Sequence, residues 1–319
     1  MAADGTIGEV GEFALIDRLT DGLSENGHVL VGPGDDTALV AAPDGRVLVT
    51  VDILVEGRHF RRDWSTPVDI GRKAAAASLA DIAAMGGAAT ALVVAFAAPA
   101  DLPAAWAIQC MSGLVEEAAI VGASVVGGDI SAAEAIVISV TAIGDLAGAT
   151  PVRRSGAKAG DRIALAGRVG WSAAGLAVLS RGFRSPRVLV NAHRFPEPPY
   201  SAGPLAAKAG ATSMIDVSDG LIADARHVAE ASSVVMSISS SAIDVPEEIR
   251  ATAAAYNVDP RLWLLTGGED HALLATFGGR RKLPAGFIEI GVVEELGEQG
   301  PGVVIDGVRD TSRGGHRHF

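Results

Sequence analysis

The stretch KAAAASLADIAAMGG, residues 73–87, is predicted to be the second half of a long helix followed by a turn. The helix should begin at Thr66-Pro67, because threonine can cap a helix and proline suits the first helical position. It should end at the glycine pair, where a left-handed backbone is easily adopted. Apolar runs at 47–51 and 91–97 flank it and are typical of buried strands. Strands alternating with helices predict a mixed α/β (α+β) layer architecture.

A polar stretch from Asp145 to Gly160, punctuated by glycine and proline, predicts a domain boundary. We therefore expect an N-terminal domain over 1–148 and a C-terminal domain over 149–319. The length of 319 residues fits two domains. The second half again mixes strands with helices, and Arg184–Pro204 is predicted to be a proline-rich connection.

Charge and cysteine content exclude several classes of function. The formal net charge is −12 and the single cysteine is Cys110. An acidic chain is a poor partner for nucleic acid or an anionic membrane. A lone cysteine excludes an internal disulfide and a cysteine-based zinc site, and it fits a reducing compartment. Residues 88–98 form the longest apolar run, which is too short to span a bilayer, and the acidic N-terminus is unlike a signal peptide. We expect a cytoplasmic protein.

Acidic residues recur beside glycines or at the ends of predicted strands. They are Asp35 and Asp36, Asp52, Asp129, Asp216 and Asp219, and Glu269 and Asp270. Strand ends are where α/β proteins build ligand sites. Each acid also has a plainer interpretation as a turn residue or a helix cap.

Asp81 is different because it lies inside the predicted helix among apolar neighbours. A buried carboxylate needs a partner, since an isolated buried charge is very costly. Lys73 lies eight residues earlier, about 12 Å along a helix and too far for a direct pair. A bound cation is one candidate partner, and capping of a neighbouring element is the alternative.

If these acids converge, cations must hold them together. Two carboxylates about 4 Å apart repel by roughly 4 kcal/mol at an effective dielectric near 20. Oxygen-only ligands select hard ions such as Mg²⁺, which keeps positions open for phosphate oxygens. Glycine-rich turns would let backbone N–H groups approach the same phosphates. The pattern indicates metal-dependent nucleotide chemistry, without the motifs of P-loop enzymes or protein kinases.

Eight segments together resemble the thiamine-monophosphate kinase family. They are GEFALIDRL (11–19), GPGDD (32–36), TVDILVEGRHF (50–60), KAAAASLADIAAMGG (73–87), GGD (127–129), RSGAKAGD (154–161), IDVSDGL (215–221) and GGED (267–270). The family belongs to a superfamily with aminoimidazole ribonucleotide synthetase, selenophosphate synthetase and the hydrogenase-maturation dehydratase. The segments occur in order along nearly the whole chain.

The resemblance implies a fold and an activity. The fold would be the two-domain aminoimidazole ribonucleotide synthetase-like fold, with an N-terminal ATP- and Mg²⁺-binding sheet domain that pairs across a homodimer and a C-terminal α/β domain. The activity would be Mg²⁺-dependent transfer of the ATP γ-phosphoryl group to thiamine monophosphate, giving thiamine diphosphate and ADP by direct in-line transfer. The acceptor is already anionic, so no general base and no catalytic side chain is required.

The resemblance also implies roles for residues. Several Mg²⁺ ions would be held by Asp36, Thr50, Asp52, Asp81, Asp129, Asp216 and Asp219. ATP contacts would fall on Gly128, Asp129, Arg154 and Ser218, and substrate contacts on His59, Glu269 and His316. His316 stands where the family often has an aromatic residue that contacts the thiamine rings. Val51 stands where the family often has a hydroxyl-bearing residue before Asp52.

Three alternatives remain on the sequence alone. A selenophosphate synthetase-like or hydrogenase-maturation-like enzyme would need a reactive cysteine, but Cys110 lies on the apolar stripe of a predicted helix and the chain ends His-Arg-His-Phe. A non-catalytic thiamine-phosphate sensor with the same fold would need fewer metal ligands. Arg154 and His59 could also be, respectively, a solvated linker residue and a structural residue.

Overall fold

A computed structural model describes residues 5–33 and 37–311 of the chain. The chain divides into two compact units. One consists of Met1–Ile82 and Gly87–Gly148, and the other of Ala83–Gly86 and Ala149–Phe319. The chain therefore passes between the units three times. No helix among the described residues is long and apolar enough to cross a membrane.

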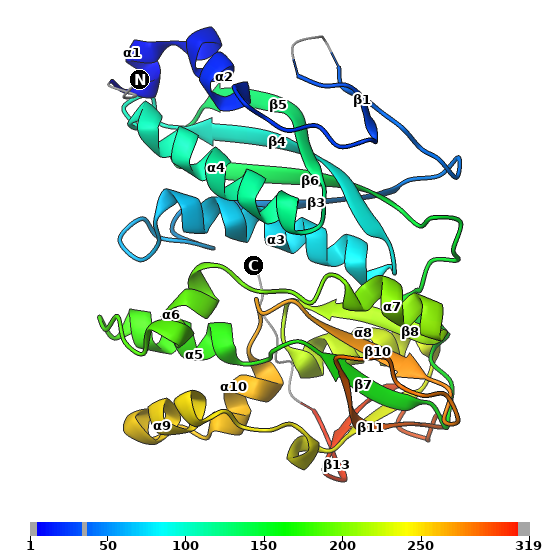
Figure 1. The fold of residues 1–319 in the computed structure, drawn as a ribbon. Helices are drawn as coiled ribbons and strands as arrows, with labels where there is room; N and C mark the ends of the chain where they lie inside the picture. Colours follow the sequence, from blue (N-terminus) through cyan, green and yellow to red (C-terminus); the bar gives the residue numbers. More distant parts are fainter. Residues whose placement is uncertain (1–4, 34–36, 312–319) are drawn as a thin grey trace. The chain divides into compact units, whose positions relative to one another are not determined.

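The first unit is built on a four-stranded sheet in the order β3-β6-β4-β5 (Figure 1). Its strands are β3 (Leu48–Val55), β4 (Ala88–Ala98), β5 (Ser124–Ala132) and β6 (Val137–Asp145). Strands β4 and β5 run parallel, and the other two pairs are antiparallel. The N-terminal part adds α1 (Ile7–Val10), α2 (Glu12–Thr20), β1 (Val29–Val31) and β2 (Leu39–Val40).

Helices α3 (Pro67–Ala84) and α4 (Ala104–Ile120) cover one face of this sheet (Figure 1). Helix α3 begins where the sequence predicts, because Thr66 and Asp69 form a reciprocal cap: each backbone N–H donates to the other side chain, at 2.9 and 3.2 Å. On the covered face Ile138 and Val140 of β6 are buried. The other face of β3 carries Val51, which is 61% exposed.

Two acids expected at strand ends lie inside strands instead. Asp52 lies in the middle of β3, which pairs with β6 over its whole length. Asp129 lies within β5, because Gly127 and Gly128 do not end the strand. The register between β5 and β4 shifts just before Gly127, which has φ +150°, and the two strands then continue to pair. A glycine pair predicts a break, but pairing with a long neighbour carries the strand through it.

The second unit contains a seven-stranded mixed sheet in the order β13-β12-β9-β11-β7-β10-β8. Its strands are β7 (Arg162–Ala166), β8 (Ala211–Val217), β9 (Val235–Ile238), β10 (Ala272–Phe277), β11 (Phe287–Glu294), β12 (Gly302–Ile305) and β13 (Val308–Arg309). The α-helices are α5 (Trp171–Ser180), α6 (Arg187–Arg194), α7 (Ala202–Ala209), α8 (Leu221–Ser232), α9 (Glu247–Tyr256) and α10 (Pro260–Thr266). Two short 3₁₀ helices cover Arg154–Gly156 and Ser240–Ala242.

This sheet is buried on both faces at β10, whereas β11 carries exposed side chains such as Ile288 and Val292. Alternate residues of β10 divide between two cores, so that Leu274 packs into the larger core with Leu221 and Leu264, and Leu273 packs into the smaller one with Ala206. The larger core includes residues of α5, α6, α8, α9 and α10, and the smaller one residues of α7 and the end of α3. Strand β10 is therefore a nearly continuous run of apolar residues rather than an alternation of apolar and polar residues.

Two helices interrupt the stretch that was predicted to be a connection. Helices α6 and the start of α7 both fall within Arg184–Pro204. Leu189, Val190 and His193 of α6 are buried, with the three- and four-residue spacing of an amphipathic helix. The flanking prolines hid this pattern, although proline at a helix border is compatible with a helix.

Candidate functional site

Three predicted ligands of the first unit lie on the covered face of its sheet. The Oγ1 of Thr50 donates a hydrogen bond to Asp81 Oδ2 at 2.6 Å. The Oγ of Ser78 in α3 lies 2.9 Å from Asp52 Oδ2 and 2.8 Å from the Val140 carbonyl oxygen. Thr50 and Asp52 share this face because they are two residues apart on β3. Asp81 thus has a hydroxyl partner, Thr50, on β3. A second carboxylate, that of Asp52, lies two residues farther along the same strand.

Asp129 and Gly128 lie on the edge strand β5 and line a pocket of about 910 Å³. Ser139 and Thr141 of β6 line it from the face of the sheet that α3 does not cover, and residues of α2 and the β1–β2 region close its sides. Gly128 approaches its neighbour closely, since a Cβ there would lie 1.9 Å from the Val94 carbonyl oxygen. Only glycine fits this position, because β4 fills the space that a side chain would need, and Gly128 itself is exposed beside Asp129.

His59 follows β3 in a turn that fixes its ring. The N–H of Val55 donates to His59 Nδ1 at 2.9 Å, and Lys73 Nζ donates to the His59 carbonyl oxygen at 3.1 Å. Because Nδ1 accepts a hydrogen bond, the proton of the neutral ring is on Nε2. The nitrogen that can donate to a substrate phosphate is therefore Nε2.

In the second unit the SDGL turn (218–221) and the GGED turn (267–270) are bonded to each other. The N–H of Glu269 donates to the Ser218 carbonyl oxygen at 2.8 Å, and the N–H of His271 donates to that of Val217 at 3.1 Å. A Cβ on Gly268 would lie 2.3 Å from the Ser218 carbonyl oxygen. The two motifs, about 50 residues apart in sequence, thus form one structural feature at the end of β8.

Asp216 enters this feature through His271. Asp216 Oδ2 lies 3.0 Å from His271 Nδ1, and both residues are buried. His271 has φ +53° and Glu269 has φ +66°, in the left-handed region that non-glycine residues rarely adopt. Such backbone strain persists only where the surrounding contacts impose it, and it is common at functional sites.

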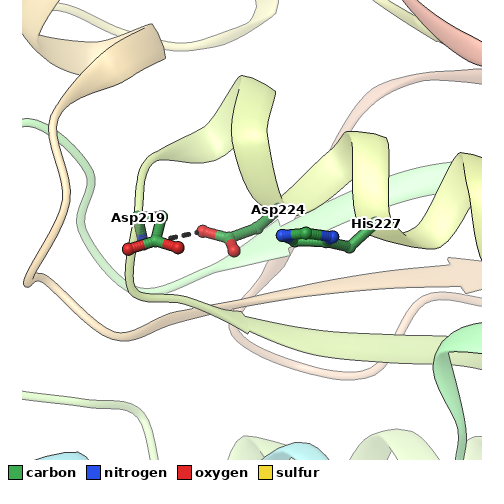
Figure 2. Close-up of side chains that lie close together, drawn as sticks. All are labelled: Asp219, Asp224 and His227. Atoms are coloured by element: carbon green, nitrogen blue, oxygen red, sulfur yellow. Dashed lines mark hydrogen bonds between the residues drawn. The ribbon is translucent and has the colours of Figure 1, made fainter. Parts of the chain in front are cut away.

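One group of three ligand-type side chains gathers here, namely Asp219, Asp224 and His227 (Figure 2). Their ligand atoms all lie within 4.8 Å of one another, and among the described residues no other such group forms. Asp224 Oδ2 accepts hydrogen bonds from the N–H groups of Asp219 and Gly220 at 3.0 and 3.1 Å. Burial, together with the charge of Asp216, raises the pKa of Asp224 to about 7.

Asp270 ties the GGED turn to the start of α5. Its Oδ1 accepts a hydrogen bond from the N–H of Ser172 at 2.9 Å, and its Oδ2 is buried without a hydrogen-bond partner among the described residues. Burial raises the pKa of Asp270 to about 7, against hydrogen bonds from Ser172 and Gly170. Next to it, Glu269 Oε2 lies 3.5 Å from His193 Nδ1.

Arg154 lies at the other end of the second unit's α8. Its carbonyl oxygen accepts a hydrogen bond from Ser232 Oγ at 2.8 Å, whereas Asp219 and Ser218 precede the first turn of that helix. Twelve helical residues span about 18 Å. The structure therefore does not bring the Arg154 backbone close to Ser218, and its exposed side chain is the part that could reach a ligand.

The donors present fit a hard cation. In the first unit Thr50, Asp52 and Asp81 offer oxygen atoms, and in the second Asp216 and Asp219 do the same beside the largely buried Asp224. Mg²⁺ prefers such carboxylate and hydroxyl oxygens. Burial is the main cause of the raised pKa of Asp224, and the negative charges of Asp216 and Asp219 add to it.

The chain is similar in sequence to known proteins along nearly its whole length. The AIR synthase related protein, N-terminal domain family matches residues 34–146. Thiamine-monophosphate kinase of Mycobacterium tuberculosis is 51% identical over 316 residues, which cover 98% of this chain and 93% of that protein. The chain belongs to the thiamine-monophosphate kinase family. The Aquifex aeolicus member is 34% identical over 316 residues, 98% of this chain and 99% of that protein.

The fold of the family is also that of this chain. The solved structure of AaThiL complexed with AMPPCP and TMP matches with a TM-score of 0.80 and 34% identity, covering 98% of each chain. The resemblance in sequence and the expected mixed α/β, aminoimidazole ribonucleotide synthetase-like fold are confirmed.

Two predicted residues of the family site, Asp36 and His316, lie outside the described residues. The reasoning from sequence also missed four residues that the structure places at the SDGL and GGED turns, namely Asp224, His227, His193 and His271. Asp224 and His227 stand one helical turn apart after the SDGL motif, a spacing that could have marked them. His193 was missed because the residues of α6 are predicted from sequence to be a connection, in which no buried face is expected.

Proposed function

We propose that this protein is a Mg²⁺-dependent kinase that transfers the γ-phosphoryl group of ATP directly to thiamine monophosphate, giving thiamine diphosphate and ADP. The observation that carries the proposal is the bonded pair of SDGL and GGED turns, which gathers Asp216, Asp219 and Glu269 at one end of β8. Its support is the 51% identity to a named thiamine-monophosphate kinase and a relative's complex with AMPPCP and TMP.

The protein must position the two substrates and neutralise their negative charge for this reaction. The acceptor is a phosphate oxygen that is already anionic near neutral pH, so no side chain has to remove a proton. The difficulty is to bring two polyanions together in line. Fixed turns with strained, bonded backbones are suited to holding donors in one geometry without reorganisation.

We propose that Mg²⁺ ions are held by Thr50, Asp52, Asp81 and Asp129 in the first unit and by Asp216 and Asp219 in the second. Asp36 completes the proposed set. These residues would hold Mg²⁺, which would supply positive charge to neutralise the phosphates. Ser78 and His271 orient two of these carboxylates through hydrogen-bond contacts of 2.9 and 3.0 Å.

The remaining contacts are to the two substrates. Gly128 is exposed beside Asp129 in the wall of the pocket and is a proposed ATP contact, as is Ser218. Arg154 is exposed, and its guanidinium can bind a phosphate with two hydrogen bonds. His59 can donate from Nε2 to the phosphate of thiamine monophosphate. Glu269 offers a carboxylate to the positively charged thiazolium or to the aminopyrimidine, and His316 is proposed to contact the rings.

We also propose a homodimer formed through the first unit's sheet. Val49, Val51 and Ile53 alternate on the uncovered face of β3 and are 63, 61 and 54% exposed. A run of apolar side chains on a sheet face that no helix covers is a suitable surface for a second copy. A cytoplasmic location is proposed as well, because ATP is a cytoplasmic substrate.

Cysteine chemistry has no place in this reaction. Cys110 is buried, and burial raises the pKa of its thiol to about 12, so it is not a nucleophile. The sensor alternative predicts binding without turnover. Incubation of the purified protein with Mg²⁺, ATP and thiamine monophosphate distinguishes the two, since the kinase forms thiamine diphosphate and ADP in equal amounts.

A further inference from the structure

A buried histidine lies behind Glu269. His193 of α6 has Nδ1 3.5 Å from Glu269 Oε2 and 3.1 Å from Ser172 Oγ. The His193 side chain is 7% exposed, whereas that of Glu269 is 34% exposed. One side of the Glu269 carboxylate therefore faces the protein interior and the other side faces outward.

The neighbours of His193 determine where its proton lies. A bare Nδ1 would turn a lone pair toward the Glu269 carboxylate, which is unfavourable in a buried setting. A proton on Nδ1 is attracted to Glu269 Oε2 and can be shared with Ser172 Oγ. We assign the proton to Nδ1, so that the imidazole donates toward both oxygen atoms.

The frame around this contact is rigid. Gly175 of α5 packs directly on α6, since a Cβ there would lie 2.0 Å from the Leu189 carbonyl oxygen and 2.9 Å from His193 Cβ. The N–H of Ser172 donates to Asp270 Oδ1 at 2.9 Å. Ser172, in the first turn of α5, thus contacts His193 through its hydroxyl group and Asp270 of the GGED motif through its backbone N–H. This fixes the distance between His193 and Glu269.

We propose that His193 is a positioning residue for recognition of thiamine monophosphate. It holds Oε2 of Glu269, so that the partly exposed carboxylate keeps one orientation in which to meet the cationic or amino-bearing part of the substrate. Without it, Glu269 would keep its bonded backbone but regain side-chain freedom, and binding would have to order that side chain. The inference rests on the proposed function, because it takes Glu269 as a substrate contact.

The variant His193→Ala tests this by steady-state kinetics with each substrate varied in turn. We expect the KM for thiamine monophosphate to rise about tenfold, while kcat and the KM for ATP change less than twofold. The matched variant His193→Asn places an amide N–H near the position of Nδ1, and we expect it to recover most of the lost affinity. Ser172→Ala, which removes the hydroxyl that fixes the His193 ring, should raise this KM only two- to threefold.

A double variant with Glu269→Gln provides the control. If His193 acts through Glu269, His193→Ala should add less than twofold to the KM for thiamine monophosphate once Glu269 is changed. A purely structural role predicts instead a loss of kcat and of both affinities, without rescue by asparagine. If His193→Ala does not fold, His193→Asn with a KM within threefold of wild type and Ser172→Ala with a KM raised two- to threefold support the proposal, and any other outcome for this pair contradicts it.

Calorimetric binding of thiamine monophosphate to the full chain keeps this inference distinct from the proposed function. Binding about tenfold weaker in His193→Ala supports the positioning role even if the wild-type protein shows no turnover. Active wild-type protein with unchanged KM and binding in folded His193→Ala overturns the inference and leaves the kinase proposal standing. Wild-type protein that neither binds nor converts the substrate overturns both.

Discussion

The contact between the SDGL and GGED turns leaves no room for a side chain at Gly268. An alanine Cβ there would lie 2.3 Å from the Ser218 carbonyl oxygen, and real Cβ contacts essentially never fall below 3.0 Å. The turns must separate by at least about 0.7 Å in Gly268→Ala. The φ angle of Gly268 is outside the left-handed region, so the change tests the contact rather than backbone strain. A misplacement near 1 Å can lower the rate about 100-fold, equivalent to about 2.7 kcal/mol.

We therefore expect kcat/KM for thiamine monophosphate to fall about 100-fold in Gly268→Ala, measured by ADP release. Gly278→Ala is the matched control, because the nearest atom to its added Cβ is Asp161 Oδ1 at 4.0 Å. It should retain wild-type activity. Both variants should keep the wild-type circular dichroism spectrum. Activity of folded Gly268→Ala within threefold of wild type would show that the joined turns do not position the reaction.

Asp52→Asn and Asp129→Asn should each abolish turnover in a folded protein, and near-normal activity at low Mg²⁺ would exclude the proposed metal role. Asp270 has a pKa of about 7 when folded against 3.8 as its reference. The unfolded chain therefore loses this proton first, and the ionised folded form is penalised as pH rises from 4 to 7. Asp270→Asn should thus gain about 2 kcal/mol of unfolding free energy relative to wild type between pH 5 and pH 8, in urea titrations, whereas a pH-independent difference would contradict the assigned burial effect. Val51→Asp should convert a dimer to monomer in light scattering at micromolar concentration, and a monomeric wild-type protein would refute the dimer.

The sequence predicts the long helix of the first unit well. Its cap at Thr66 and Asp69 is local, and the helix observed, Pro67–Ala84, ends within a residue of the predicted turn. The strand bounds fail because they depend on pairing partners far away in sequence. Asp52 and Asp129 lie inside strands since β6 and β4 extend the ladders past the local break signals.

For the site as for the strands, features that depend on neighbouring residues are predicted from the sequence, and features that depend on contacts between distant residues are not. The SDGL and GGED motifs were visible as residues, but that Gly268 packs on Ser218 depends on β8 and β10 being neighbours. His193 was invisible because α6 lies between prolines and contributes one polar residue to an otherwise apolar face. The motifs thus predict the residues proposed to bind metal and substrates, whereas the residues that position them, such as His193, are found only in the fold.

Phosphoryl transfer from ATP to thiamine monophosphate is the activity on which every proposed residue role depends. The most direct measurement is the stoichiometry of products formed by purified protein with Mg²⁺, ATP and thiamine monophosphate, resolved by chromatography. We expect one thiamine diphosphate for each ADP and no product when Mg²⁺ is removed by a chelator. Tight binding of thiamine monophosphate without any thiamine diphosphate, or turnover of free thiamine in its place, would contradict it.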